Sequence, residues 1–267
     1  MIIGNKEFKD RTYIMGILNV TPDSFSDGGN FNNLDSALRH TEKMIQEGAD
    51  IIDVGGESTR PGHTQITVAQ EIERTAPVVE KIKAEFDIPV SIDTYKSAVA
   101  LEAVKAGADL LNDIWGFKYD ENMALLGAKY NLPCCLMHNR KEPCQGNFMQ
   151  DVLVDLQGSI DIALKAGIDR DKIMIDPGVG FGKTYEQNLE VINKTEMLKT
   201  LGYPVLFASS RKSVIGNTLY LPVDERLEGT IATTVIAVMK GCLFVRVHDV
   251  EENKRAILMT EKILGRF

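Results

Sequence analysis

Polar and charged side chains stand at the carboxyl ends of short apolar runs throughout the chain. In order, these side chains are Asn19, Asp53, Asp93, Asn112, Asp113, His138, Asp176, Ser209, Ser210, Arg211, Lys212, Arg246 and His248. One such residue alone would be explained as a cap that ends a strand. Because the pattern recurs after each apolar run, we expect the side chains to meet at one edge of a sheet and to form an active site there.

A period of two along the runs indicates which of these groups converge. It puts Arg246 and His248 on one face of the last run, so both point toward the same site. A buried carboxylate such as Asp93 or Asp176 is costly without a cation or a polar ligand beside it. A structural ion pair, for example between Asp176 and Lys212, is the alternative to a ligand site.

Two long loops follow the first two apolar runs. Residues 21–29 and 55–62 combine glycine and proline with carboxylates, hydroxyls, an arginine and an aromatic ring. Glycine and proline alone would indicate only turns. The added functional groups predict loops that close over a substrate at the active-site end of the fold.

The elements that hold these side chains alternate along the whole chain. Eight β-branched apolar runs predict strands at residues 12–20, 51–56, 89–94, 110–114, 133–138, 173–178, 204–210 and 243–249. Helical periodicity lies between them, as at 34–49, 68–86 and 150–167, and residues 250–265 close the chain. Nearly continuous apolar strands suit a parallel sheet covered on both faces. We therefore predict an α/β fold, a (β/α)8 TIM barrel that forms a single domain over residues 1–267, with an open doubly wound sheet as the alternative.

Composition excludes several classes of protein. Hydrophobic residues make up 44% of the chain and charged residues 25%, as in soluble globular proteins. The net charge of -8 argues against nucleic acids and membrane surfaces as partners, so an anionic ligand needs a local cluster of cations. No apolar run reaches the roughly 20 residues of a membrane helix, and the first residues lack the apolar core of a secretion signal. Four cysteines without a CxxC pair predict free buried thiols, and we expect a cytoplasmic protein.

Two long motifs resemble one family. Residues 15–29 (MGILNVTPDSFSDGG) and 53–62 (DVGGESTRPG) are similar to the pterin-binding signature of bacterial dihydropteroate synthases. The resemblance continues through residues 91–94, 112–113, 137–138, 176–183, 209–213 and 246–249. It spans nearly the whole chain, and only the stretch 139–147 has no match and receives no role.

The resemblance implies a reaction and a set of site residues. The amine of p-aminobenzoate would displace pyrophosphate from the methylene of a pterin diphosphate, through a species close to a pterin cation. The implied pterin and diphosphate ligands are Thr59, Arg60, Asp93, Asn112, Asp176, Lys212, Arg246, Val247 and His248. The implied p-aminobenzoate site consists of Phe25, Pro61, Lys212 and Ser213. The catalytic groups would be Asp27, which stabilises the cation, with Arg246, His248 and Lys212, and Asn19 would bind Mg2+ together with the diphosphate.

Three other functions compete with this interpretation. A pterin-binding methyltransferase module with a corrinoid partner would need no diphosphate clamp. The runs at 209–213 and 246–248 favour such a clamp and therefore count against the methyltransferase. Schiff-base chemistry at Lys212 would need an apolar pocket, whereas its neighbours Ser209, Ser210 and Arg211 favour anion binding. A noncatalytic pterin-binding subunit should lack at least one residue of the implied site, and all of the following are present: Asn19, Asp27, Asp93, Asp176, Lys212, Arg246 and His248. The resemblance further implies a homodimer, and the apolar residues 230–239 could serve as its interface or equally pack against the barrel.

Overall fold

Eight parallel strands form the centre of the computed structural model, which describes residues 1–21, 30–57 and 65–266. The strands are β3 (Tyr13–Asn19), β4 (Ile51–Gly55), β5 (Val90–Asp93), β6 (Leu110–Asp113), β7 (Cys134–Met137), β8 (Ile173–Asp176), β9 (Leu206–Phe207) and β10 (Phe244–Val247). Each lies within the range expected from its apolar run. Their order in the sheet is β8-β7-β6-β5-β4-β3-β10-β9.

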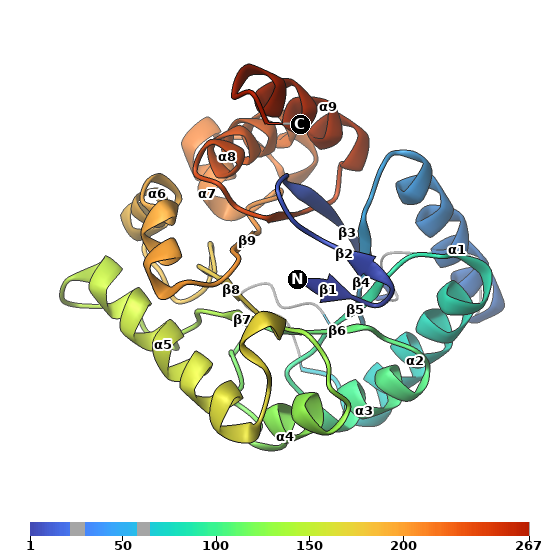
Figure 1. Cartoon of the computed structure of the whole chain (residues 1–267). Coiled ribbons are helices and arrows are strands. Elements are labelled where there is room, and N and C mark those ends of the chain that lie inside the picture. The colour runs from blue at the N-terminus through green and yellow to red at the C-terminus, as the bar shows by residue number, and fades with distance from the viewer. Residues whose placement is uncertain (22–29, 58–64, 267) are drawn as a thin grey trace.

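Helices follow the strands and surround them (Figure 1). They are α1 (Asn30–Gln46), α2 (Val68–Glu85), α3 (Ser97–Lys105), α4 (Asn122–Lys129), α5 (Phe148–Ala166), α6 (Tyr185–Asn193), α7 (Ser213–Leu219), α8 (Leu227–Met239) and α9 (Val250–Ile263), with 3-10 turns at Arg170–Lys172, Thr195–Leu201 and Val223–Glu225. Capping explains several boundaries. Thr67 and Thr184 each form a capping box, with Gln70 and Gln187 respectively, and so begin α2 and α6.

The sheet closes into a barrel. The two ends of the strand order meet where Ile175 of β8 forms a parallel bridge with Val205, just before β9. The predicted (β/α)8 barrel is therefore confirmed, and the open doubly wound sheet is wrong. Since all the strands run in parallel, their carboxyl ends share one mouth of the barrel.

Strand alternation divides the apolar side chains between two layers. Adjacent Cys134 and Cys135 show the division: Cys134 packs with the residues between strands and helices, whereas Cys135 packs with those inside the barrel. Phe244 lies inside and Val245 outside in the same way. All four cysteines are buried and unpaired, as the sequence predicts.

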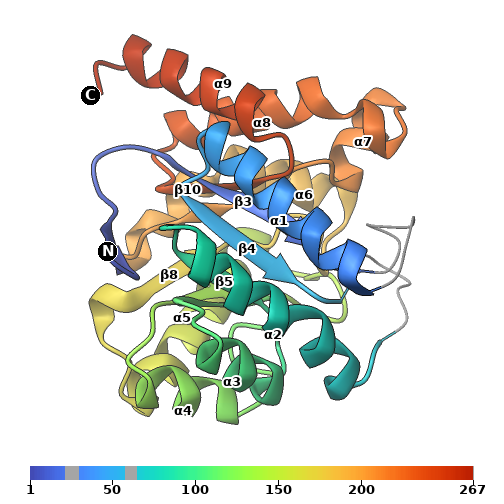
Figure 2. The same cartoon turned by 90° about the vertical axis from the view of Figure 1, so that its right-hand side faces the viewer.

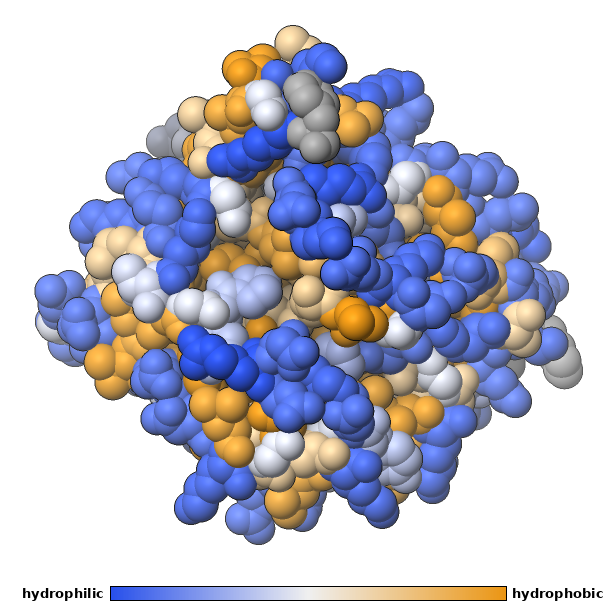
Figure 3. Space-filling view, viewed as in Figure 1, coloured by the Kyte–Doolittle hydropathy of each residue, from blue (hydrophilic) through white to orange (hydrophobic). Residues whose placement is uncertain are grey.

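A small hairpin that the sequence analysis did not anticipate covers the amino end of the barrel. Strands β1 (Ile2–Ile3) and β2 (Lys6–Glu7) pair antiparallel, and Phe8 follows them into the barrel interior. The Phe8 ring lies 4.8 Å from that of Tyr13 and 5.2 Å from that of Phe244. Figure 2 places the hairpin at the end opposite to the one toward which β4 points, and Figure 3 shows apolar residues at the middle of this face inside a largely hydrophilic rim. The candidate site residues therefore lie at the opposite, carboxyl end.

Candidate active site

Three strands bring one arginine and two aspartates together inside the barrel. Arg246 Nε of β10 donates to Asp53 Oδ2 of β4 at 2.6 Å, and Arg246 Nη2 donates to Asp93 Oδ2 of β5 at 2.6 Å. The predicted inward face of Arg246 is thus found, but its partners are carboxylates 193 and 153 residues away. Asn112 at the end of β6 joins the group, because its Nδ2 donates to Asp53 Oδ2 at 3.1 Å.

Each aspartate keeps one buried oxygen without a partner. In the described part of the chain, Asp53 Oδ1 and Asp93 Oδ1 are shielded from solvent and accept no hydrogen bond. Unsatisfied buried acceptors are rare and costly in native proteins. Two of them, side by side at the mouth of a barrel, indicate a ligand that brings hydrogen-bond donors.

The buried charges perturb one another. Burial raises the pKa of Asp93 to about 7, and the nearby carboxylates of Asp53, Glu71 and Asp113 raise it further, whereas Arg246 opposes the shift. Burial also works against the charge of Arg246, but Asp53 and Asp93 hold the pKa of the guanidinium above its ordinary value. Asp93 therefore changes its protonation in the neutral range, as functional carboxylates often do.

A second group at the mouth contains Asp176 and Lys212. Asp176 Oδ1 accepts the backbone N–H of Gly178 at 2.6 Å, and burial raises its pKa. Lys212 Nζ donates to the Val179 carbonyl at 2.5 Å and lies 4.7 Å above the Phe181 ring. Burial lowers the pKa of Lys212 to about 8, Arg246 lowers it too, and the carboxylates of Asp176 and Asp93 raise it. The charge of Asp176 favours the charged lysine, but the Lys212 ammonium group donates to a backbone carbonyl rather than forming the ion pair of the alternative.

His248 and Arg211 are held by neighbours. His248 Nδ1 lies 2.9 Å from Ser210 Oγ, and the same hydroxyl accepts the backbone N–H of His248 at 3.2 Å. Arg211 Nε donates to Asp249 Oδ2 at 3.0 Å. The charge of Arg211 is therefore balanced by Asp249. Lys212 and Arg246 are the cations of these two segments that face the barrel.

Asn19 offers an amide oxygen at the end of β3. It pairs in register with Gly55, and a side chain at Gly55 would stand 3.7 Å from both Asn19 Oδ1 and Asp93 Oδ2. Glycine thus keeps the space between these two oxygens open. Within residues 1–21, 30–57 and 65–266, no group of three His, Cys, Asp or Glu side chains is placed to hold a metal. Mg2+ needs no such cage, because it usually takes few protein ligands and fills its octahedron with phosphate oxygens and water.

Of the other implied site residues, Ser213 and Val247 lie within the described part of the chain. Ser213 is the first residue of α7 and directly follows Lys212, whereas the Val247 side chain packs in the outer layer between strands and helices. A ligand contact of Val247 would therefore have to come from its backbone. Five implied site residues lie outside the described part of the chain: Phe25, Asp27, Thr59, Arg60 and Pro61.

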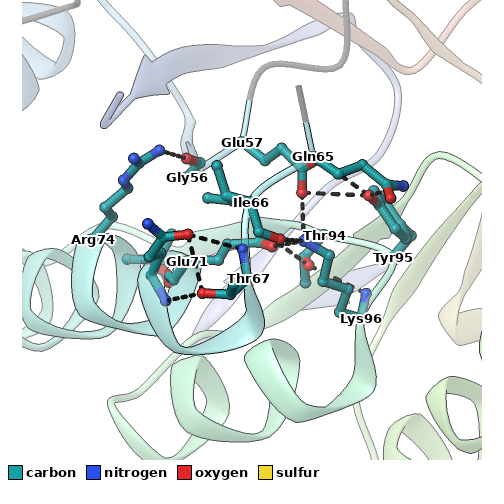
Figure 4. Close-up of polar contacts among 12 residues, drawn as sticks. Gly56, Glu57, Gln65, Ile66, Thr67, Glu71, Arg74, Thr94, Tyr95 and Lys96 are labelled. Atoms are coloured by element: carbon teal, nitrogen blue, oxygen red, sulfur yellow. Dashed lines mark hydrogen bonds and ion pairs between the residues drawn. The ribbon is translucent and has the colours of Figure 1, made fainter. Parts of the chain in front are cut away.

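Sequence reasoning missed a partly buried lysine, Lys96, that bonds to Glu57, Ile66 and Glu71 (Figure 4). Lys96 Nζ donates to Glu57 Oε2 at 2.5 Å, to Glu71 Oε2 at 2.7 Å and to the Ile66 carbonyl at 2.9 Å. Both carboxylates are almost fully buried. Spacing gives no sign of this cluster, because its three charges come from separate elements.

Residues 139–147, the stretch without an assigned role, form most of the connection between β7 and α5 and bond to neighbouring helices. Arg140 Nε donates to Asp155 Oδ2 of α5 at 2.5 Å, and the Cys144 carbonyl accepts from Gln187 Nε2 of α6 at 2.8 Å. These contacts fix the stretch against two helices.

Comparisons with known proteins identify the family and the fold. The model of the family described as "Pterin binding enzyme" matches residues 15–248. A dihydropteroate synthase of Clostridium beijerinckii is 61% identical over 269 residues, which are 100% of both chains. A crystal structure of the Clostridium difficile dihydropteroate synthase in the presence of pteroic acid has a TM-score of 0.94 and 52% identity, over 97% of this chain and 98% of that one. The Xanthomonas albilineans dihydropteroate synthase with 4-aminobenzoic acid has a TM-score of 0.92 and 38% identity, over 96% and 94% of the two chains.

Proposed function

Because this chain belongs to the dihydropteroate synthases, within the pterin-binding enzymes, we propose that its barrel mouth joins p-aminobenzoate to 6-hydroxymethyl-7,8-dihydropterin diphosphate. The products are 7,8-dihydropteroate, a precursor in folate biosynthesis, and pyrophosphate. The enzyme is a transferase. Similarity over the full length of a synthase favours this reaction over a methyltransferase module.

The observation that carries the proposal is the pair of unsatisfied carboxylate oxygens beside Arg246. An aminopterin ring presents adjacent N–H donors, which Asp93 Oδ1 and Asp53 Oδ1 can accept. Arg246 fixes the other oxygen of each aspartate, so the two acceptors are oriented before the ligand arrives. Asn112, Asp176 and Lys212 complete the pterin site in this proposal.

The proposed reaction is a displacement at the pterin methylene. The arylamine nitrogen of p-aminobenzoate forms the new C–N bond, the C–O bond to the diphosphate breaks, and its electron pair leaves with pyrophosphate. The amine proton passes to solvent or to the leaving group. Negative charge grows on the diphosphate as the bond breaks, so Arg246 and His248 stabilise the transition state more than the ground state. The two bonds from Arg246 to aspartates use two of the five N–H groups of a guanidinium, which leaves donors for a diphosphate oxygen.

We also propose that Asn19 contributes its amide oxygen to a Mg2+ ion shared with the diphosphate. The bound ion would supply neutralisation of the diphosphate charge. The space that Gly55 keeps beside Asn19 Oδ1 supports this assignment. Substitution of Asn19 by alanine should weaken Mg2+-dependent binding of pyrophosphate, measured by calorimetry with and without the metal.

Assembly and location are further proposals. We propose a single-domain chain that forms a homodimer in the cytoplasm. Four buried, unpaired cysteines suit a reducing compartment. Exposed Met239 at the end of α8, with exposed Leu258, Met259 and Ile263 on neighbouring α9, supports an apolar interface there. Sedimentation equilibrium tests the dimer. Among the described helices, none has the length and apolar character to cross a membrane.

One assay tests the function. Purified protein, Mg2+, the pterin diphosphate and p-aminobenzoate should release pyrophosphate and form dihydropteroate in equal amounts, and omission of either substrate should abolish product formation. Binding of the pterin without any turnover would instead identify a noncatalytic pterin-binding subunit.

A further inference from the structure

Lys183 is a partly buried centre of hydrogen bonds beside the candidate site. Its Nζ donates to the Gly178 carbonyl at 2.8 Å and to the Phe181 carbonyl at 2.9 Å, and it lies 2.8 Å from His138 Nδ1. These partners account for all three N–H groups of an ammonium ion. Two of them belong to the connection between β8 and α6, so Lys183 ties residues 178–183 into a closed loop.

This loop holds the two groups at the mouth that carry opposite charge. The Gly178 N–H donates to Asp176 Oδ1, and the Val179 carbonyl accepts from Lys212 Nζ. The Phe181 ring lies under the same Lys212 ammonium group. A shift of the loop would therefore move an acceptor, a cation and an aromatic face together.

The loop of residues 178–183 packs directly against the backbone that follows β7. Gly178 has a φ of +67°, and a side chain there would come within 1.9 Å of the His138 carbonyl oxygen. Gly182 has a φ of +54°, and a side chain there would come within 2.2 Å of the Arg140 carbonyl oxygen. Only glycine permits this close approach, and Lys183 provides the side-chain bond across the same contact.

A chain of hydrogen bonds runs from Lys183 through His138 to Asp155 of helix α5. Burial and the charge of Lys183 lower the pKa of His138 to about 3, so the ring is neutral at physiological pH. A neutral ring can accept from Lys183 at Nδ1 and donate from Nε2 to Asp155 Oδ2, which lies 3.1 Å away. Asp155 also accepts from Arg140. The chain of bonds thus anchors the loop on a rigid helix.

We propose that Lys183 is a positioning residue for the reaction, which holds the loop that orients Asp176 and Lys212 for both substrates. The inference rests on the proposed function, because that function gives Asp176 and Lys212 their ligands. Lys183 itself donates its N–H groups within the protein and touches no reacting atom.

The position of Lys183 makes the loop sensitive to pH. Burial lowers the pKa of Lys183 to about 7, the charge of Lys212 contributes, and Asp176, Cys144 and Asp155 oppose the shift. Above that pH the neutral amine has two N–H groups for three acceptors. Asp93 also titrates near 7 and Lys212 near 8, so the contribution of Lys183 must be taken as the difference between variant and wild type.

The decisive variant is Lys183→Met, which keeps the length of the side chain and removes its donors. We expect kcat/KM to fall by about a hundredfold, the loss that a misplacement of about 1 Å can cause, with a clear rise in KM for both substrates. Lys194→Met is the matched control, because Lys194 pairs with Glu190 on the exposed face of the next helix. A merely structural role would lower the folded fraction, and hence kcat, without a change in KM.

Two further measurements keep the inference testable. Both Lys183 and Asp93 titrate near pH 7, so the step near pH 7 in the wild-type profile of kcat/KM should become smaller in Lys183→Met by the contribution of Lys183, while the step near 8 remains. If that variant does not fold, Asp155→Asn weakens the anchor and should raise KM in the same direction by a smaller factor. A folded Lys183→Met with KM values within twofold of wild type, or an Asp155→Asn variant with unchanged KM when the first does not fold, overturns the inference. A wild-type protein without pyrophosphate release would instead defeat the proposed function.

Discussion

Removal of the Arg246 side chain should reduce both stability and turnover, for separate reasons. The guanidinium stands 2.6 Å from an oxygen of Asp53 and 2.6 Å from an oxygen of Asp93, and Asp53 is fully buried. Arg246→Ala leaves two carboxylates inside the barrel without their cation. Breaking a buried pair in this way costs about 3–5 kcal/mol of unfolding free energy.

The loss of stability should depend on pH in a defined direction. The pKa of Asp93 is raised to about 7 in the folded protein although Arg246 lowers it, so without Arg246 it rises further. A carboxyl whose pKa is higher in the folded than in the unfolded state loses stability as pH rises from the unfolded value, near 4, through the folded one. Near pH 5 Asp93 is protonated in both folded proteins, and its charge adds little to the difference between them. The deficit of Arg246→Ala should therefore be larger at pH 8 than at pH 5.

Urea unfolding at the two pH values measures the deficit, and steady-state kinetics under conditions where the variant is folded measures turnover. We expect kcat/KM to fall at least about a hundredfold, because a preorganised donor to the leaving group is lost. An equal deficit at both pH values would contradict the role of Asp93 in the pair. An unchanged kcat at saturating pterin diphosphate would contradict the leaving-group role of Arg246.

Other consequences can be measured independently. Asp93→Asn should weaken pterin binding at pH 8 by about 1.5–3 kcal/mol, because it removes a charge-assisted acceptor; unchanged affinity in calorimetry removes Asp93 from the site. Binding should be ordered, since p-aminobenzoate packs against groups organised by the diphosphate, and equal p-aminobenzoate affinity with and without pyrophosphate contradicts this. Lys96→Met should lower the unfolding free energy by about 3–5 kcal/mol, because Glu57 and Glu71 lose their cation; a melting temperature equal to wild type argues against the cluster. Phe8→Ala should lower the unfolding free energy by about 3–5 kcal/mol and leave the KM values unchanged. Altered KM values would show that the packing of Phe8 at the amino end affects the site.

The repeated alternation of apolar runs was sufficient to predict the barrel. Each strand lies within its expected range because parallel strands buried on both faces leave a plain compositional signal. The inward face of Arg246 followed from the period of two, and Phe244 beside it is indeed inside. Helix ends shifted by a few residues: α1 begins at Asn30 rather than 34, because hydrophobic periodicity marks the apolar face of a helix and not its first residue.

Partners were harder to predict than faces. The period of two places Arg246 in the barrel but carries no information about which carboxylate, more than 150 residues away in sequence, will stand opposite. The hairpin β1–β2 escaped notice because two-residue strands have no periodicity to detect. Lys183 bonds to two backbone carbonyls, which any residue provides, and Lys96 pairs with two carboxylates from separate elements, so no side-chain pattern in the sequence marks their partners.

Within the described residues, the hairpin fills the amino end of the barrel, so a ligand would enter and leave at the carboxyl end. Ile3 and Phe8 are buried where a second exit would have to pass. When ligands enter and leave at the same end, the ligand that binds first and deepest is the last to dissociate. A pterin bound deep in the barrel departs only after whatever stands above it has gone, so pyrophosphate should clear the mouth before the joined product can withdraw.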